Sequence, residues 1–136
     1  METFTEIREF VYQNFNLVHD EPFLIGIEVA VGEHGRRQSL FMAELKGNDG
    51  GRFLRVETTI APLEEFDAEK CLRLNLMQRT GYLAVGDLNG VPYIKMCENI
   101  PYGMLKPSNL VYTIERMAPR ADEIERALSG DDVDIS

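Results

Sequence analysis

The chain has no tryptophan, only two cysteines and two histidines, and far fewer basic than acidic residues. Its 14 Lys and Arg against 23 Asp and Glu give a formal net charge of −9 over 136 residues. This charge opposes binding to nucleic acid phosphates or to anionic lipid, because both depend on a positive field. Apolar stretches such as residues 23–27 are far shorter than the ~20 residues that cross a bilayer. We therefore expect neither a nucleic acid nor a membrane as a partner.

The scarcity of cysteine also bears on the cellular compartment. Cys71 and Cys97 stand in unrelated contexts, which suits a reducing compartment where buried thiols act as small hydrophobes. The first residues lack the basic segment and apolar run of a signal peptide, so we expect a cytoplasmic protein without a disulfide. A chain of this length buries about two-thirds of its unfolded surface, enough for a single core. We predict one domain over residues 1–130 and an acidic tail over 131–136.

Hydrophobic periodicity predicts eight elements in the order α-β-β-β-α-β-β-α. The expected helices cover residues 2–15, 67–79 and 107–130, and the expected strands cover residues 23–31, 37–45, 53–60, 82–85 and 91–97. Asn89-Gly90 is a strong signal for a tight hairpin between the last two strands. The pattern predicts an α+β fold in which three helices accompany a five-stranded antiparallel sheet. The first and last helices are expected to cover mainly one face of it.

Two predicted helices carry finer signals. The last begins near Pro107, and its apolar positions keep one register on both sides of Pro119, which indicates a single kinked helix ended by Gly130. The middle helix has Asp67 as its expected N-cap. Its predicted apolar stripe consists of Ala68, Cys71, Leu72, Asn75, Leu76 and Arg79. Because a buried amide needs a partner, we favour a structural role for Asn75, capping a strand end or a helix, over ligand contact.

The residues that carry catalytic chemistry are few and isolated. His19 and His34 fall in predicted loops, and neither belongs to a metal-ligand motif such as His-Glu-x-x-His or Cys-x-x-Cys. Cys71 and Cys97 have no neighbouring base in sequence, so we expect buried structural thiols. Neither a Rossmann nor a P-loop glycine spacing is present. We predict no catalytic residue, no metal and no cofactor.

Four arginines are the main basic feature of the chain. Arg36, Arg37, Arg52 and Arg55 lie on adjacent predicted strands in an otherwise negative protein. They could form a patch for an acidic partner. Solvated sheet edges or salt bridges to nearby acids explain them equally well, and we favour this second interpretation.

The order of the elements and several short sequence segments resemble those of a known fold. An α-β-β-β-α-β-β-α chain of this size and acidity resembles the type III secretion chaperone-like fold. YbjN-like domains are the nearest family, and the class I, or Tir-type, secretion chaperones are second. The segments that carry the likeness are RRQS at residues 36–39, RVETTIAP at 55–62, LRLN at 72–75 and ADEIERAL at 121–128. The resemblance covers residues 4–128.

This resemblance implies a non-enzymatic protein, commonly dimeric, that binds another polypeptide or modulates a process without chemistry. It places the dimer or partner interface at the middle helix and last strands. The candidate interface residues are Cys71, Leu74, Met77, Gln78, Tyr82, Tyr93 and Met96. The residues add an argument of their own, because the large apolar groups in this set are too many to leave wet on a monomer.

Three functions from different classes stay open at this point. The first is a homodimeric, chaperone-like module that binds a polypeptide partner, and we favour it. The second is a regulatory domain that senses a small ligand in a pocket without reactive groups. The third is a small enzyme that uses His19 and nearby carboxylates in a concave site.

Overall fold

The computed structural model describes residues 1–128 of the chain. The expected helix end at Gly130 and the acidic tail over 131–136 lie outside these residues. The helices are α1 (Phe4–Asn14), α2 (Ala68–Asn75) and α3 (Pro107–Leu128), with short 3-10 turns at η1 (Leu63–Glu65) and η2 (Tyr102–Met104). The strands are β1 (Asn16–Glu21), β2 (Leu24–Ala30), β3 (Arg37–Lys46), β4 (Arg52–Pro62), β5 (Tyr82–Leu88) and β6 (Val91–Pro101).

The strands form one antiparallel sheet in the order β1-β2-β3-β4-β6-β5. The prediction of five strands was therefore wrong, because the sheet has six and β1 was missed. This strand lies at the edge of the sheet, and a bulge between Leu17 and His19 interrupts its pairing with β2. A bulged, polar edge strand does not show the strict alternation by which strands are found in a sequence.

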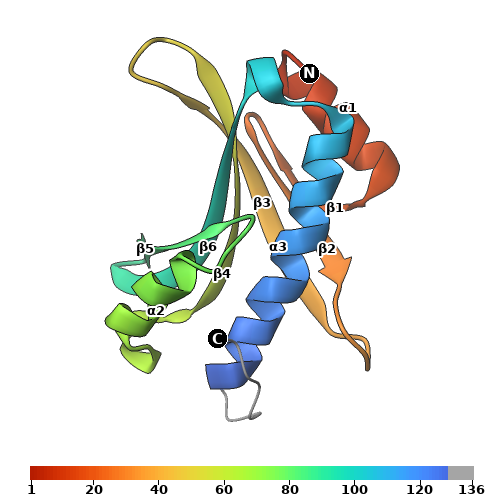
Figure 1. Ribbon diagram of the computed structural model, residues 1–136. Coiled ribbons are helices and arrows are strands. Elements are labelled where there is room, and N and C mark those ends of the chain that lie inside the picture. The colour runs from red at the N-terminus through yellow and green to blue at the C-terminus, as the bar shows by residue number, and fades with distance from the viewer. Residues whose placement is uncertain (129–136) are drawn as a thin grey trace.

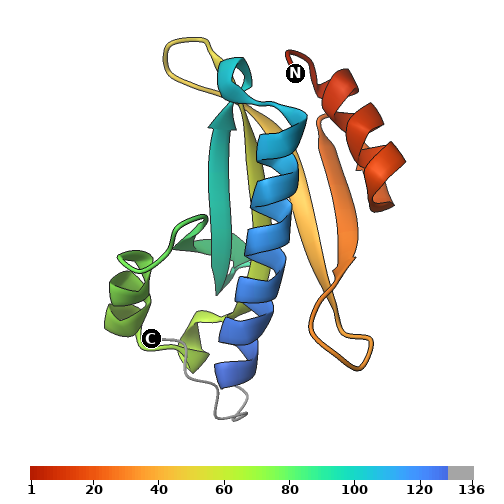
Figure 2. The ribbon, with the colours of Figure 1, turned by 45° about the vertical axis from the view of Figure 1, so that its right-hand side comes forward.

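The two long helices lie on the same face of the sheet, as Figures 1 and 2 show. On this face the sheet contributes fully buried side chains such as Ile27, Leu40 and Val56. The side chains of α3 that pack against it have no exposed surface, and they are Leu110, Ile114, Met117, Ala121 and Ile124. The predicted arrangement of helices on one face is confirmed. In the described part of the chain no helix covers the opposite face, which we call the helix-free face.

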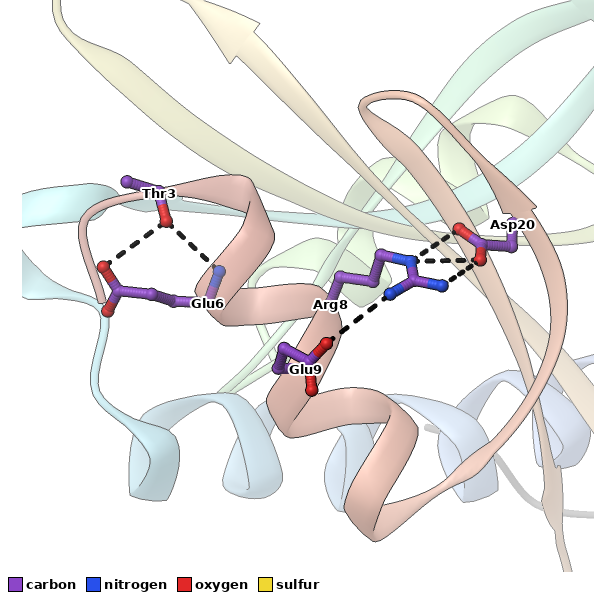
Figure 3. Close-up of polar contacts among 5 residues, drawn as sticks. All are labelled: Thr3, Glu6, Arg8, Glu9 and Asp20. Carbon is purple, nitrogen blue, oxygen red and sulfur yellow. Dashed lines mark hydrogen bonds and ion pairs between the residues drawn. The ribbon is translucent and has the colours of Figure 1, made fainter.

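The first helix is held to the edge of the sheet by polar contacts (Figure 3). Thr3 caps α1, because its hydroxyl oxygen accepts a hydrogen bond of 3.2 Å from the Glu6 backbone N–H. The Nε–H of Arg8 donates to both carboxylate oxygens of Asp20 on β1, at 2.8 and 3.0 Å. This hydrogen bonding lowers the pKa of Asp20 below its usual value. The contact joins α1 to an edge strand that has few apolar residues of its own.

The last helix is one continuous element across Pro119, as predicted. It is also tied to the turn between β2 and β3, where Arg36 reaches the nearly buried carboxylate of Asp122. The Nη2–Oδ2 distance of this ion pair is 3.2 Å. In the described residues no helix is long and apolar enough to cross a membrane.

The middle helix differs from its prediction in length and in the face it buries. It ends at Asn75 rather than near residue 79, and Asp67 is its N-cap as expected. Its buried side chains are Cys71 and Leu74, whereas Leu72 is 70% exposed. The predicted stripe was wrong because it assumed a longer helix lying flat on the core, whereas α2 packs one short side beside β5.

We expect that Ile114→Ala lowers the free energy of unfolding by about 2–5 kcal/mol, because the lost side chain leaves a cavity between α3 and the sheet. Chemical denaturation of the purified protein measures this change. The matched control is Leu72→Ala at an exposed position, for which a change within about 0.5 kcal/mol is expected. Equal effects of the two substitutions would contradict the core assignment.

Candidate functional site

Large apolar side chains are exposed on α2, on the residues just after it and on the β5–β6 hairpin, and α2 lies beside β5 (Figure 1). We call this set the α2–β5 surface, and it consists of Leu72, Leu76, Met77, Val85, Leu88 and Val91. Leu76 is 90% exposed and Met77 66% exposed. Single exposed apolar residues are common, but several on adjoining elements indicate an interaction site.

Asn75 fixes α2 to the outer edge of β5. Its side-chain oxygen accepts a hydrogen bond of 2.6 Å from the Leu83 N–H, and its side-chain nitrogen donates to the Leu83 carbonyl at 3.2 Å. The amide thus makes the two bonds that a neighbouring strand would make. This confirms the predicted structural role of Asn75 at a strand, and it presents the next two residues of the α2–β5 surface to solvent.

The structure distributes the predicted interface residues over three environments. Cys71, Leu74 and Met96 are buried within the monomer, at 6%, 4% and 0% exposure. The expectation that Leu74 and Met96 would be exposed to solvent without a dimer is therefore wrong, since α2, α3 and the sheet of the same chain cover them. Met77 is exposed, and Gln78 accepts a hydrogen bond of 2.9 Å from the Arg120 Nε–H.

The remaining two predicted residues lie on the helix-free face. Tyr82 and Tyr93 belong to the neighbouring strands β5 and β6 and are half-buried. The Tyr82 hydroxyl accepts a hydrogen bond of 2.9 Å from Asn99, whose side-chain oxygen accepts one of 2.9 Å from Arg55. Phe41 and Phe53 add half-buried aromatic surface to this face. It is an amphipathic surface rather than a second apolar core.

The candidate nucleophiles and ligands are not assembled into a reactive site. Burial, and after it the nearby negative charge of Glu57, raises the pKa of the Cys97 thiol to about 11, so little reactive thiolate forms near neutral pH. His19 lies on β1, not in a loop as predicted, and contacts Glu21. Within residues 1–128 no group of three or more His, Cys, Asp and Glu is arranged to hold a metal ion.

The four arginines singled out from the sequence do not form one patch. Arg36 pairs with Asp122, and Arg37 lies 4.0 Å from Glu28 across β2 and β3. Arg52 lies at the far end of the hairpin opposite Lys46, because β3 and β4 are antiparallel. The interpretation as local ion pairs is confirmed for Arg36 and Arg37.

Two open hollows lie along α3, with volumes of 410 and 380 Å³. They share Arg79 and Thr80 from the segment between α2 and β5. In the first, the Ser108 hydroxyl contacts Asn109 at 3.5 Å rather than a base. These hollows are the places where a small ligand would bind under the sensing hypothesis, and they carry no catalytic pair.

Comparison with known proteins identifies the fold. No protein-family model matches the sequence, and no curated protein matches it significantly. Solved structures show that the chain has the type III secretion chaperone-like fold predicted from its resemblance.

Two solved structures carry this assignment. A chain from the HopA1–SchA chaperone–effector complex matches with a TM-score of 0.56 and 14% identity, over 91% of this chain and 90% of that chain. YbjN from E. coli, a candidate transcription regulator, matches with a TM-score of 0.56 and 8% identity, over 93% and 88%. At these identities the likeness concerns the fold alone.

Sequence reasoning missed most of the α2–β5 surface. Of its members only Met77 was proposed for an interface, whereas Leu72 and Leu76 were assigned to the core. The available signal was Asn75, since a helix that stops at a strand-capping amide exposes the residues that follow.

We expect that Asn75→Ala lowers the free energy of unfolding by about 1–3 kcal/mol, because it leaves two backbone groups of Leu83 without their protein partner. Hydrogen exchange of the Leu83 amide should accelerate more than that of other β5 amides. Asn48→Ala, in the exposed loop between β3 and β4, serves as the control. Unchanged protection of the Leu83 amide would show that the side chain does not cap this strand.

Proposed function

We propose that this protein is not an enzyme and that it binds a polypeptide partner through the α2–β5 surface. The observation that carries the proposal is the exposure of large apolar side chains on α2 and on the β5–β6 hairpin, outside any reactive constellation. Methionine adapts to differently shaped apolar partners, and Met77 lies in the chain between α2 and β5, the two elements that carry this surface. Aspartate and glutamate elsewhere keep such a protein dispersed, because like charges repel.

The fold supports this proposal. One neighbour with this architecture comes from a complex named for a chaperone and its effector, and neither neighbour is named as an enzyme. A chaperone-like role needs an accessible apolar surface that receives a segment of another chain, and the α2–β5 surface meets that need. Regulation by a small ligand in the hollows beside α3 is the alternative.

We further propose that the protein acts as a homodimer whose copies meet through the helix-free face around Tyr82 and Tyr93. The supporting observation is that Tyr82 and Tyr93 are half-buried on a face that also carries Phe41 and Phe53 and that no described helix covers. Tyrosine contributes a large contact area and a hydrogen-bonding hydroxyl, which suits a surface that is exposed to water in the monomer and buried in the dimer.

We expect that Met77→Asp weakens capture of polypeptide partners by roughly tenfold or more, because it places a charge in the apolar surface. Quantitative affinity capture from lysate, followed by titration of each purified candidate partner, measures the effect. Met104→Asp is a matched control, since Met104 is also 66% exposed but lies on η2, away from α2. Equal binding by both variants would contradict the proposed surface.

We expect a mass of twice 15.5 kDa in sedimentation equilibrium at micromolar concentration. Tyr93→Glu should shift the protein toward the monomer, because it introduces a carboxylate into the proposed interface. Tyr12→Glu, on the exposed side of α1, should leave the mass unchanged. A monomeric wild type would refute the dimer while leaving partner binding open to its own test.

A further inference from the structure

The outer edge of β5 carries unpaired backbone groups. β5 and β6 are joined by a two-residue turn at Asn89-Gly90, where both residues have positive φ, and Leu88 pairs with Val91 beside it. In an antiparallel ladder alternate residues turn their N–H and C=O groups toward the partner strand. From this turn, Val85 and Asp87 direct theirs away from β6, as Leu83 does toward Asn75.

Among residues 1–128, these outward groups have no partner on another element. Across residues 1–128, no hydrogen bond reaches the N–H or C=O of Val85 or Asp87 from outside β5 and β6. The register supports this orientation, because Pro92, which has no N–H to donate, stands opposite Asp87. An edge strand with free groups beside exposed apolar residues is a template for another strand.

The opposite edge of the sheet, at β1, carries features that block pairing with another strand. β1 has a bulge beside Val18 and carries Asp20 and Glu21, and Arg8 of α1 binds Asp20 across it. Bulges, charges and covering elements are the usual means of blocking edge pairing. At β5, within residues 1–128, the outward backbone groups of Leu83 are filled by Asn75, and no bulge interrupts the strand.

We propose that the edge of β5 at Val85 and Asp87 receives an extended segment of the polypeptide partner as an added strand. This inference rests on the proposed function and specifies how the partner binds. Asn75 sets one end of the site, because its amide already fills the place of a strand opposite Leu83. The chain beyond it offers Leu76 and Met77 as apolar contacts for the continuation of the segment.

The surroundings of this edge define the chemistry of the segment. Val85 and Asp87 project to the helix-bearing side of the sheet, and Ala84 and Gly86 to the helix-free side, because successive side chains alternate. A matching strand would place an apolar residue beside Val85, a basic residue two positions away beside Asp87, and residues of either kind on the other face. The net charge of −9 also favours a basic segment.

A second copy of the chain fits this edge less well. Two β5 strands paired about a two-fold axis at Val85 would bring Asp87 of each copy opposite Leu83 of the other, where Asn75 is already bound. An axis at Asp87 would instead place two aspartates directly opposite each other, which is destabilising. An axis at Gly86 would place each Asp87 opposite a Val85, so neither carboxylate would meet a cation. A basic segment meets Asp87 better than any of these pairings, so we assign the edge to a segment of a different polypeptide.

The test uses a synthetic peptide with the repeat Val-Thr-Lys-Thr, which puts valine and lysine two positions apart on one face, and the same peptide with glutamate for lysine. We expect the lysine peptide to bind and to slow hydrogen exchange at the Val85 and Asp87 amides. Val85→Pro removes the outward N–H without breaking a bond to β6 and should weaken binding roughly tenfold. Val85→Thr, which keeps that N–H, should bind nearly as the wild type does.

A charge reversal gives a second measurement that does not depend on tolerance of proline. Asp87→Lys should weaken binding of the lysine peptide and strengthen binding of the glutamate peptide, whereas Glu33→Lys in the β2–β3 turn should do neither. Wild-type affinity in both Val85→Pro and Asp87→Lys would overturn the edge site. So would protection of the Val85 and Asp87 amides that rises with protein concentration without peptide, since a second copy would then be the occupant.

The outcomes also separate this inference from the proposed function. If Met77→Asp abolishes capture of natural partners and Val85→Pro leaves it unchanged, the partner binds the α2–β5 surface without adding a strand, and only the edge inference fails. If neither substitution changes capture, the proposed function fails with it.

Discussion

The packing of α3 against one face of the sheet is the interaction on which the rest of the structure depends. The five α3 side chains that face the sheet are completely buried, and they span most of the helix length. Because α3 crosses the sheet in one piece, it holds together strands that are far apart in the sequence. The ion pair of Arg36 with Asp122 adds a polar tie at one end. The positions of α2 and of the two sheet edges follow from this packing of α3 on the sheet.

The two edges of the sheet are treated differently by the chain. The β1 edge is polar, bulged and contacted by α1, so it presents little for another strand to join. Within residues 1–128, the β5 edge is closed at Leu83, where the Asn75 amide makes the hydrogen bonds of a neighbouring strand. Asn75 is the last residue of α2 and is half-buried. Its two hydrogen bonds to Leu83 hold the end of the helix at β5, and the exposed Leu76 and Met77 follow directly. The same device that completes the fold thus shapes the candidate binding surface.

The contrast between the exposed apolar groups and the paired or buried polar ones is what supports the proposed binding function. Cys97 is buried with a raised pKa, His19 is paired with Glu21 on an edge strand, and the arginines near α3 and β2 are engaged in ion pairs. Each of these groups is buried or has a partner within the described chain. Met77 and Leu76 have no such structural duty, since neither is buried nor needed to close the core. Exposed apolar residues of this kind are what the proposed binding surface requires.

The sequence by itself determined the helices at both ends, the alternating strands of the central sheet, the Asn89-Gly90 hairpin and the continuity of the last helix across Pro119. These elements follow from hydrophobic periodicity and turn residues, which depend on a few neighbouring residues in the sequence. It did not determine β1, because a bulged edge strand is held by pairing with β2 and not by its own pattern. Nor did it determine that Leu74 and Met96 are core while Leu72 and Leu76 are surface, since a short helix shows its phase only once something is packed against it. For α2 the packing contact is the one between Asn75 and Leu83, in which a side-chain amide of the helix bonds the backbone of β5. Only the tertiary structure decides this contact, because it brings a helix against a strand that the local pattern does not pair with it.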